Sequence, residues 1–96
     1  MGKNSELFPE HKTAEDIQEI VRASWEAVFE TSEIDLDAYF FDLGGTSLQA
    51  LQVVDRLEHE LGILVPTTML FESPTMRLLT ASLAQLLADA RKPESA

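Results

Sequence analysis

A serine stands where a glycine-rich turn meets an apolar helical pattern. Ser47 follows Gly44 and Gly45, which in turn follow the aromatic pair Phe40-Phe41. Larger residues at 44 and 45 would shield the hydroxyl and restrict the turn, whereas glycine leaves it open. A phosphate on this hydroxyl would lie near unpaired N–H groups at the positive end of the helix dipole, a contribution of about 0.3–1 kcal/mol. Ser47 is therefore a candidate anchor for a phosphodiester.

The same serine has two other interpretations. Serine and threonine before an apolar run usually cap a helix, and Ser47 or Thr46 could do only that. An esterase would need Gly-x-Ser-x-Gly on a strand-to-helix turn, but Gln49 stands where the last glycine belongs. The local pattern leaves a cap and an attachment site open and argues against an esterase.

Amphipathic periodicity indicates the helices that must position this serine. Thr13 and Asp16 resemble a capping box before a first helix that ends near Glu30. A second helix is expected from about Ser47 to Leu61, and Gly62 follows it as a terminator.

Two further helices are expected in the second half of the chain. A short helical turn should span Thr67 to Glu72, and a last long helix should begin with Ser73 or Thr75 as its cap. The sum is an all-α domain with three long helices and one short one. The segment 31–45 is too apolar for a solvated linker, so it should pack into the core through Ile34, Leu36, Tyr39, Phe40, Phe41 and Leu43.

Composition restricts the function. The 96 residues suit one domain, expected at 13–90 between flexible tails at 1–12 and 91–96.

The net charge of -10 and the scattered cations argue against nucleic-acid and membrane binding and favour a partner with a basic surface. Without cysteine there is neither a disulfide nor a thiolate metal site. No secretory signal or membrane span is apparent, so a cytoplasmic monomer is expected.

Several other residues receive structural interpretations. The lone histidines His11 and His59 are expected at the surface, and Trp25 in the core. Asp35, Asp37 and Asp42 do not form a calcium loop, because aromatic residues occupy ligand positions. Leu48 could pack in the core or contact partners. Val65, Met69 and Leu70 could border a recognition surface, but core packing is the favoured expectation.

The wider pattern resembles a known family. The stretch Phe41-Asp42-Leu43-Gly44-Gly45-Thr46-Ser47-Leu48, followed by Leu51, Leu57, Gly62, Val65-Pro66, Leu70-Phe71 and Pro74-Thr75, is similar to acyl and peptidyl carrier proteins over about Ile17 to Leu87. The resemblance implies a four-helix bundle in which Ser47 receives 4′-phosphopantetheine from coenzyme A through a separate magnesium-dependent phosphopantetheinyl transferase. The arm's thiol would then hold acyl, aminoacyl or peptidyl groups as thioesters, and the chain itself would catalyse nothing.

The resemblance leaves the pathway and cargo open. Many fatty-acid and polyketide carriers have aspartate where this chain has Thr46, whereas Gly44-Gly45 looks more like nonribosomal peptide synthetase carriers and some modular polyketide synthase carriers. The acidic second helix resembles fatty-acid and polyketide types more. Together these features favour a carrier from a polyketide or nonribosomal peptide pathway. Implied partners are adenylation, condensation, ketosynthase, acyltransferase or thioesterase domains, and the chain could be free-standing or part of a synthase. The alternative is an acidic helical adaptor that never carries a prosthetic group.

Overall fold

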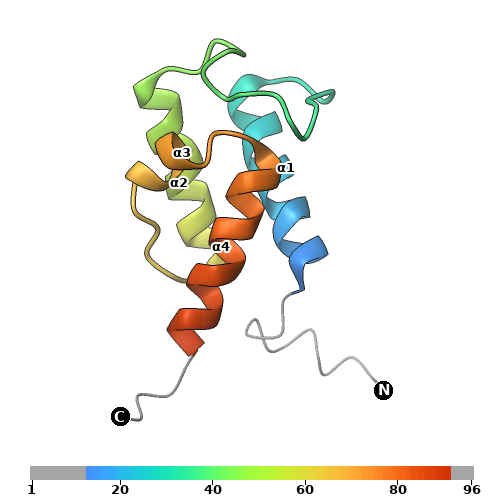
Figure 1. The fold of residues 1–96 in the computed structure, drawn as a ribbon. Coiled ribbons are helices and arrows are strands. Elements are labelled where there is room, and N and C mark those ends of the chain that lie inside the picture. Colours follow the sequence, from blue (N-terminus) through green and yellow to red (C-terminus); the bar gives the residue numbers. More distant parts are fainter. Residues whose placement is uncertain (1–12, 92–96) are drawn as a thin grey trace.

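The computed structural model describes residues 13–91, which form four helices and no strand. They are α1 (Ala14–Phe29), α2 (Ser47–Leu61), α3 (Thr68–Glu72) and α4 (Met76–Arg91). The three long helices form a bundle, and a long loop between α1 and α2 covers one end of it (Figure 1). The predicted all-α four-helix bundle is thus confirmed, and α2 has the predicted bounds. Both expected tails lie outside the described residues, except that Arg91 ends α4.

Side-chain caps fix where the long helices begin. The Thr13 hydroxyl accepts the Asp16 N–H at 3.1 Å, and the Asp16 carboxylate accepts the Thr13 N–H at 3.0 Å, so the predicted capping box is present. At α4, the Thr75 hydroxyl accepts the Leu78 N–H at 3.1 Å. Of the two predicted caps for this helix, Thr75 is the one used.

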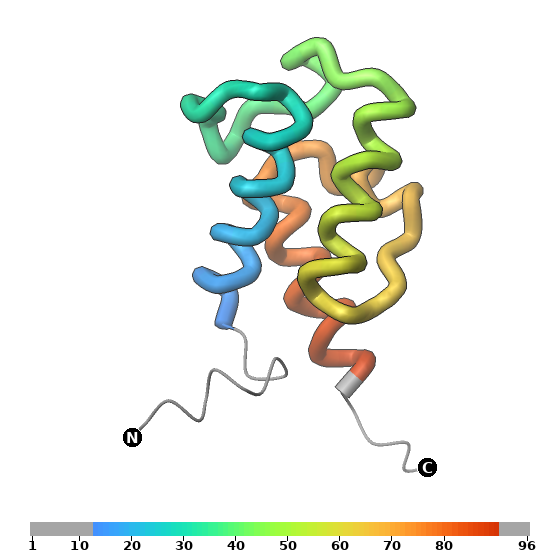
Figure 2. Tube along the Cα trace, turned by 180° about the vertical axis from the view of Figure 1, so that it is seen from behind, coloured from blue at the N-terminus to red at the C-terminus, as the bar shows by residue number. Residues whose placement is uncertain are grey.

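The core lies between α1, α2 and α4. α1 packs against both α2 and α4, and α3 packs against α4 (Figures 1 and 2). Trp25 is fully buried, as predicted, and so are Val65 and Leu70, whereas Met69 is only half-buried against the same core. The first residue of α1 and the last of α4 lie at the same end of the bundle, opposite the start of α2 (Figure 1). No helix within residues 13–91 combines the length and hydrophobicity needed to cross a membrane.

The loop between α1 and α2 packs on the bundle through one side only. Ile34 and Phe40 are buried, and the Phe40 ring lies edge-on to Trp25 with centroids 5.1 Å apart. Tyr39 and Leu43, also expected to pack inward, are instead 53% and 41% exposed. The Leu43 N–H donates to the Tyr39 carbonyl at 3.1 Å, and this helical turn places the two side chains on the side away from Phe40. Leu36 and Phe41 are half-buried.

Candidate functional site

Thr46, not Ser47, caps α2. The Thr46 hydroxyl accepts the Gln49 N–H at 3.1 Å, and the Gln49 side-chain oxygen accepts the Thr46 N–H at 3.0 Å. Thr46 has extended backbone angles, and its carbonyl accepts the first helical bond from Ala50 at 2.9 Å. Ser47 is therefore the first helical residue, and its hydroxyl is not needed to cap the helix. Capping does not explain a serine here.

The Ser47 side chain is exposed and chemically unengaged. Its hydroxyl has no hydrogen-bond partner among residues 13–91, and in the same range the N–H groups of Ser47 and Leu48 have none either. These two N–H groups lie at the positive end of the dipole of α2. No histidine or carboxylate in the described part of the chain contacts the hydroxyl as a general base. The site can hold an anion but has no machinery to activate Ser47.

Gly44 and Gly45 are both required, but for different reasons from the one expected. Gly44 has φ +94°, a conformation that residues with a side chain rarely adopt, although a Cβ there would meet open space. A Cβ on Gly45 would overlap the Phe40 ring and lie 2.8 Å from the Phe40 carbonyl oxygen. Gly44 makes the turn, and Gly45 lets it approach the buried aromatic ring. The expectation that side chains here would mainly shield the hydroxyl is replaced by these two constraints.

Hydrogen bonds and ring stacking hold the turn before Ser47. The Phe40 carbonyl accepts the Gly45 N–H at 3.1 Å, and the Gly44 N–H donates to the Phe41 carbonyl at 3.2 Å. The Phe41 ring stacks on Phe71 of α3, with centroids 5.0 Å apart and planes at 12°. The turn is thus attached to the core through Phe40 and to α3 through Phe41.

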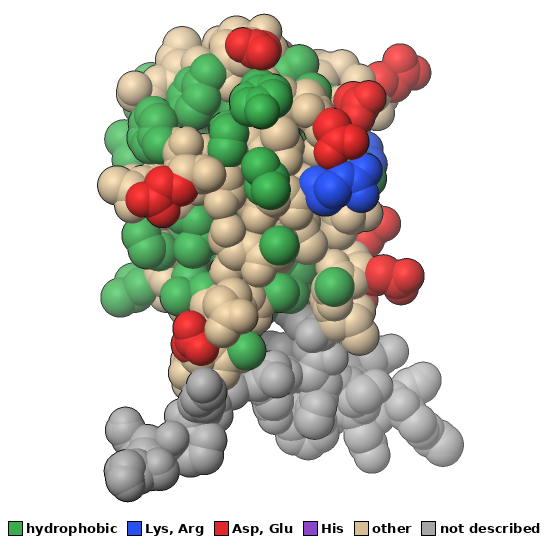
Figure 3. All heavy atoms as spheres, viewed as in Figure 1, with side chains coloured by type: hydrophobic (Ala, Val, Ile, Leu, Met, Phe, Trp, Pro, Cys, Tyr) green, Lys and Arg blue, Asp and Glu red, His purple; other side chains and the backbone are tan. Residues whose placement is uncertain are grey.

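Exposed apolar side chains surround the start of α2. Leu48 is 65% exposed, Leu51 50% and Phe71 52%. The interpretation of Leu48 as a core residue is therefore wrong, and its contact with partner proteins stays a prediction. Figure 3 shows apolar side chains gathered on the side of α2 and α3. Such a surface near the exposed Ser47 hydroxyl suits transient contact with other proteins. The exposure of Phe71 is not predictable from its spacing, because a single aromatic residue in a five-residue helix carries no periodic signal.

The remaining candidate residues lie apart from Ser47. His59 is exposed, as predicted, and His11 lies outside the described residues. The Asp35 carboxylate accepts the Asp37 N–H at 2.9 Å, and the Asp37 carboxylate pairs with Arg77. Within residues 13–91, no three histidine or acidic side chains gather as a metal site.

Comparison with known families and proteins agrees with the geometry. The profile of the family described as "Phosphopantetheine attachment site" matches residues 8–83. Tyrocidine synthase 3 of Brevibacillus parabrevis is 44% identical over 70 residues, which are 73% of this chain and 1% of that synthase. Surfactin synthase subunit 3 of Bacillus subtilis (strain 168) is 37% identical over 68 residues, 71% of this chain and 5% of that subunit. The chain therefore spans only a small part of these relatives.

The fold has a solved counterpart. BlmI, a type-II acyl carrier protein from Streptomyces verticillus involved in bleomycin biosynthesis, superimposes with a TM-score of 0.74 at 20% sequence identity. The match covers 77% of this chain and 89% of BlmI. At this identity the likeness concerns the fold alone.

Proposed function

The chain belongs to the family of phosphopantetheine-binding carrier domains, which present a covalently bound cofactor and are not enzymes themselves, and we propose that Ser47 is its attachment residue. The single observation that carries the proposal is the exposed hydroxyl at the first residue of α2, unused because Thr46 takes the capping role.

The start of α2 fits a phosphodiester. The N–H groups of Ser47 and Leu48 lack acceptors among the described residues, and the helix dipole favours negative charge at this end. Gln49, the third residue of the helix, has its N–H occupied by Thr46. Two N–H groups therefore remain to stabilise the phosphate oxygens, while the capping box keeps the helix end ordered.

The modification needs a second protein. The oxygen of the Ser47 hydroxyl would form a bond to the pantetheine-bearing phosphorus of coenzyme A, the P–O bond to the second phosphate would break, and adenosine 3′,5′-bisphosphate would leave. The hydroxyl proton would pass to a base on the transferase, because no described residue of this chain supplies one. Once attached, the cofactor supplies a thiol that holds acyl, aminoacyl or peptidyl groups as thioesters.

The partners follow from the relatives and from charge. The matching relatives are named as synthases of tyrocidine, gramicidin and surfactin, which favours nonribosomal peptide assembly over polyketide assembly. The chain would then present aminoacyl or peptidyl groups to adenylation, condensation and thioesterase domains, in the cytoplasm and as a monomeric unit. Its net charge of -10 favours partner surfaces that carry basic residues.

Mass spectrometry of the intact protein tests the attachment site. The apo protein is incubated with coenzyme A, Mg²⁺ and a promiscuous phosphopantetheinyl transferase, and one phosphopantetheine mass should be added. Ser47→Ala should show no addition. Ser32→Ala, which removes another exposed serine, should be modified like the wild type. An unmodified wild-type protein would support the adaptor alternative, and equal modification of Ser47→Ala would reject Ser47 as the site.

A further inference from the structure

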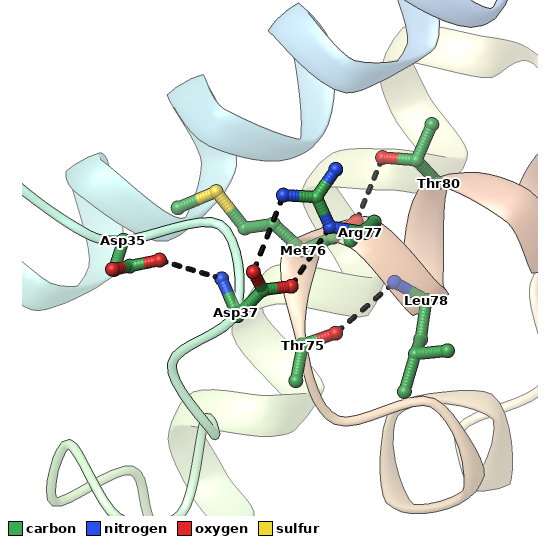
Figure 4. A network of polar contacts seen from close by, with 7 residues as sticks. All are labelled: Asp35, Asp37, Thr75, Met76, Arg77, Leu78 and Thr80. Carbon is green, nitrogen blue, oxygen red and sulfur yellow. Dashed lines mark hydrogen bonds and ion pairs between the residues drawn. The ribbon is translucent and has the colours of Figure 1, made fainter.

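The loop before Ser47 is joined to the start of α4 by an ion pair between residues far apart in the sequence. The Arg77 guanidinium donates from Nε to Asp37 Oδ1 at 2.8 Å and from Nη2 to Asp37 Oδ2 at 3.2 Å. Figure 4 shows the two side chains facing each other, one from the loop and one from the first turn of α4. Two parallel bonds fix the relative orientation of the groups, which a single contact would not do.

Backbone hydrogen bonds on either side of Asp37 also attach the loop to α4 and to the residues just before it. The Arg77 N–H donates to the Leu36 carbonyl at 3.1 Å, and the Phe40 N–H donates to the Pro74 carbonyl at 2.7 Å. The Asp37 N–H is itself held by the Asp35 carboxylate (Figure 4). Leu36 to Phe40 is therefore fixed at three points, two of them at Arg77 in the first turn of α4 and one at Pro74 in the connection between α3 and α4.

Phe40 connects this attachment to the serine. Its carbonyl accepts the Gly45 N–H at 3.1 Å, and its buried ring packs directly against Gly45. Gly45 is followed by the cap Thr46 and then by Ser47. A loop released from α4 would lose the support that holds Phe40, and the Ser47 end of α2 would visit more orientations.

We propose that Asp37 and Arg77 are positioning residues: their ion pair holds the loop in the arrangement that presents Ser47 to the modifying transferase. The inference rests on the proposed function of Ser47. An exposed ion pair contributes little to the free energy of unfolding. We therefore expect loss of the Asp37–Arg77 pair to change how well the transferase binds this protein. If only a fraction of molecules holds the competent loop, the apparent dissociation constant rises by the inverse of that fraction, while the chemical step is unchanged.

Three variants separate the pair from simple charge effects. Asp37→Asn and Arg77→Gln both break the pair but change the net charge in opposite directions, and the double variant leaves the net charge unchanged. The proposal expects each of the three to raise the transferase KM for the protein about fivefold with little change in kcat. If long-range charge were the cause, the single variants would act in opposite directions and the double variant would resemble the wild type, which would overturn the proposal.

Amide hydrogen exchange supplies a readout that needs no transferase. The amides of Phe40 and Gly45 should exchange several-fold faster in all three variants, while those in the middle of α1 stay unchanged. Glu19→Gln is the matched control, because it removes one exposed carboxylate of α1 that has no ion-pair partner among residues 13–91. It should leave both KM and exchange unaltered. If the Phe40 and Gly45 amides of the three variants exchanged at the wild-type rate, the proposal would be contradicted. Failure of the Ser47 assignment is distinguishable, because the wild-type protein would then remain unmodified in the mass-spectrometry test.

Discussion

The two ends of α2 are capped in different ways. At its C-terminal end, Gly62 adopts a left-handed conformation with φ 70°, and its N–H bonds the Glu58 carbonyl at 2.8 Å. The Glu58 carboxylate then accepts the Val65 N–H at 2.8 Å and ties down the next segment. At the N-terminal end, Thr46 and Gln49 complete a capping box, yet the next side chain, Ser47, is left without a described partner.

The comparison distinguishes the groups that stabilise a helix end from the polar groups that remain free to bind another molecule. Each end is stabilised by residues beside the helix terminus, but only the N-terminal end leaves a hydroxyl and two N–H groups free among the described residues. Because Thr46 supplies the cap, a change at the Ser47 hydroxyl would remove no helix-stabilising contact seen among the described residues. Variants around the N-terminal end of α2 should therefore divide into those that change folding and those that change only modification.

The largest effect is expected where the N-terminal end meets the core. Phe40→Ala removes a fully buried ring that packs against Trp25 and Phe29, so the free energy of unfolding should fall by about 3–5 kcal/mol. Leu48→Ala is the comparison, since that side chain is 65% exposed and should change stability by less than about 0.5 kcal/mol. Urea denaturation followed by Trp25 fluorescence measures both. If the free energy of unfolding fell equally in both variants, the buried Phe40 and the exposed Leu48 would not differ in their contribution to folding, contrary to this prediction.

The next effect is expected from overpacking at Gly45. Gly45→Ala places a methyl group into the Phe40 ring and should cost about 1–3 kcal/mol. Combining it with Phe40→Leu should recover part of that loss, because the smaller side chain makes room. Denaturation midpoints of the two single variants and the double variant give the coupling energy. An additive double variant would show that the penalty at Gly45 has another origin.

A smaller effect is expected from the cap itself. Thr46→Ala removes the hydroxyl that accepts the Gln49 N–H and should cost about 1 kcal/mol, whereas Thr46→Asp keeps an acceptor and should remain close to the wild type. Ser47→Ala should also leave stability unchanged while abolishing modification. Thermal melts paired with intact-mass spectra test all three. A Ser47→Ala variant as unstable as Thr46→Ala would mean that the serine also stabilises the helix end.

Much of this architecture could be predicted from the sequence, because helix signals are local. Thr13 with Asp16, and the apolar spacing that ends at Gly62, gave the bounds of α1 and α2 closely. Both Ser73 and Thr75 fit the cap of α4, because the sequence does not show which hydroxyl meets the helix. In the structure, Ser73 bonds Ser82 at 2.7 Å instead.

The loop and its attachments were less predictable. Composition indicated that residues 31–45 pack on the core, but not that a helical turn would direct Tyr39 and Leu43 outward. The sequence around Asp37 indicates nothing beyond a rejected calcium loop. Its contact with Arg77 joins residues forty positions apart, and no periodic pattern connects such positions. Long-range polar contacts on irregular backbone therefore required the structure.

The smallest predicted effect concerns pH and tests whether the attachment of the loop is electrostatic. The hydrogen bonds from Arg77 lower the pKa of the Asp37 carboxyl below its ordinary value, and the Arg77 charge adds to this. A carboxyl with a lowered folded-state pKa contributes stability above its unfolded pKa of about 3.9, and that contribution is lost as the pH falls through the folded value. The difference in melting temperature between the wild type and Asp37→Asn should therefore be small and constant from about pH 7 to 5. It should shrink as the pH falls below about 3.9 and be lost once the pH lies below the lowered pKa of folded Asp37, where both proteins carry an uncharged group facing Arg77. Glu19→Gln, which removes an exposed carboxylate of α1, is measured in parallel and separates this loss from the general acid destabilisation of an acidic domain. A difference that stays constant throughout the acid range would mean that Asp37 acts through its shape or its backbone, and not through its charge.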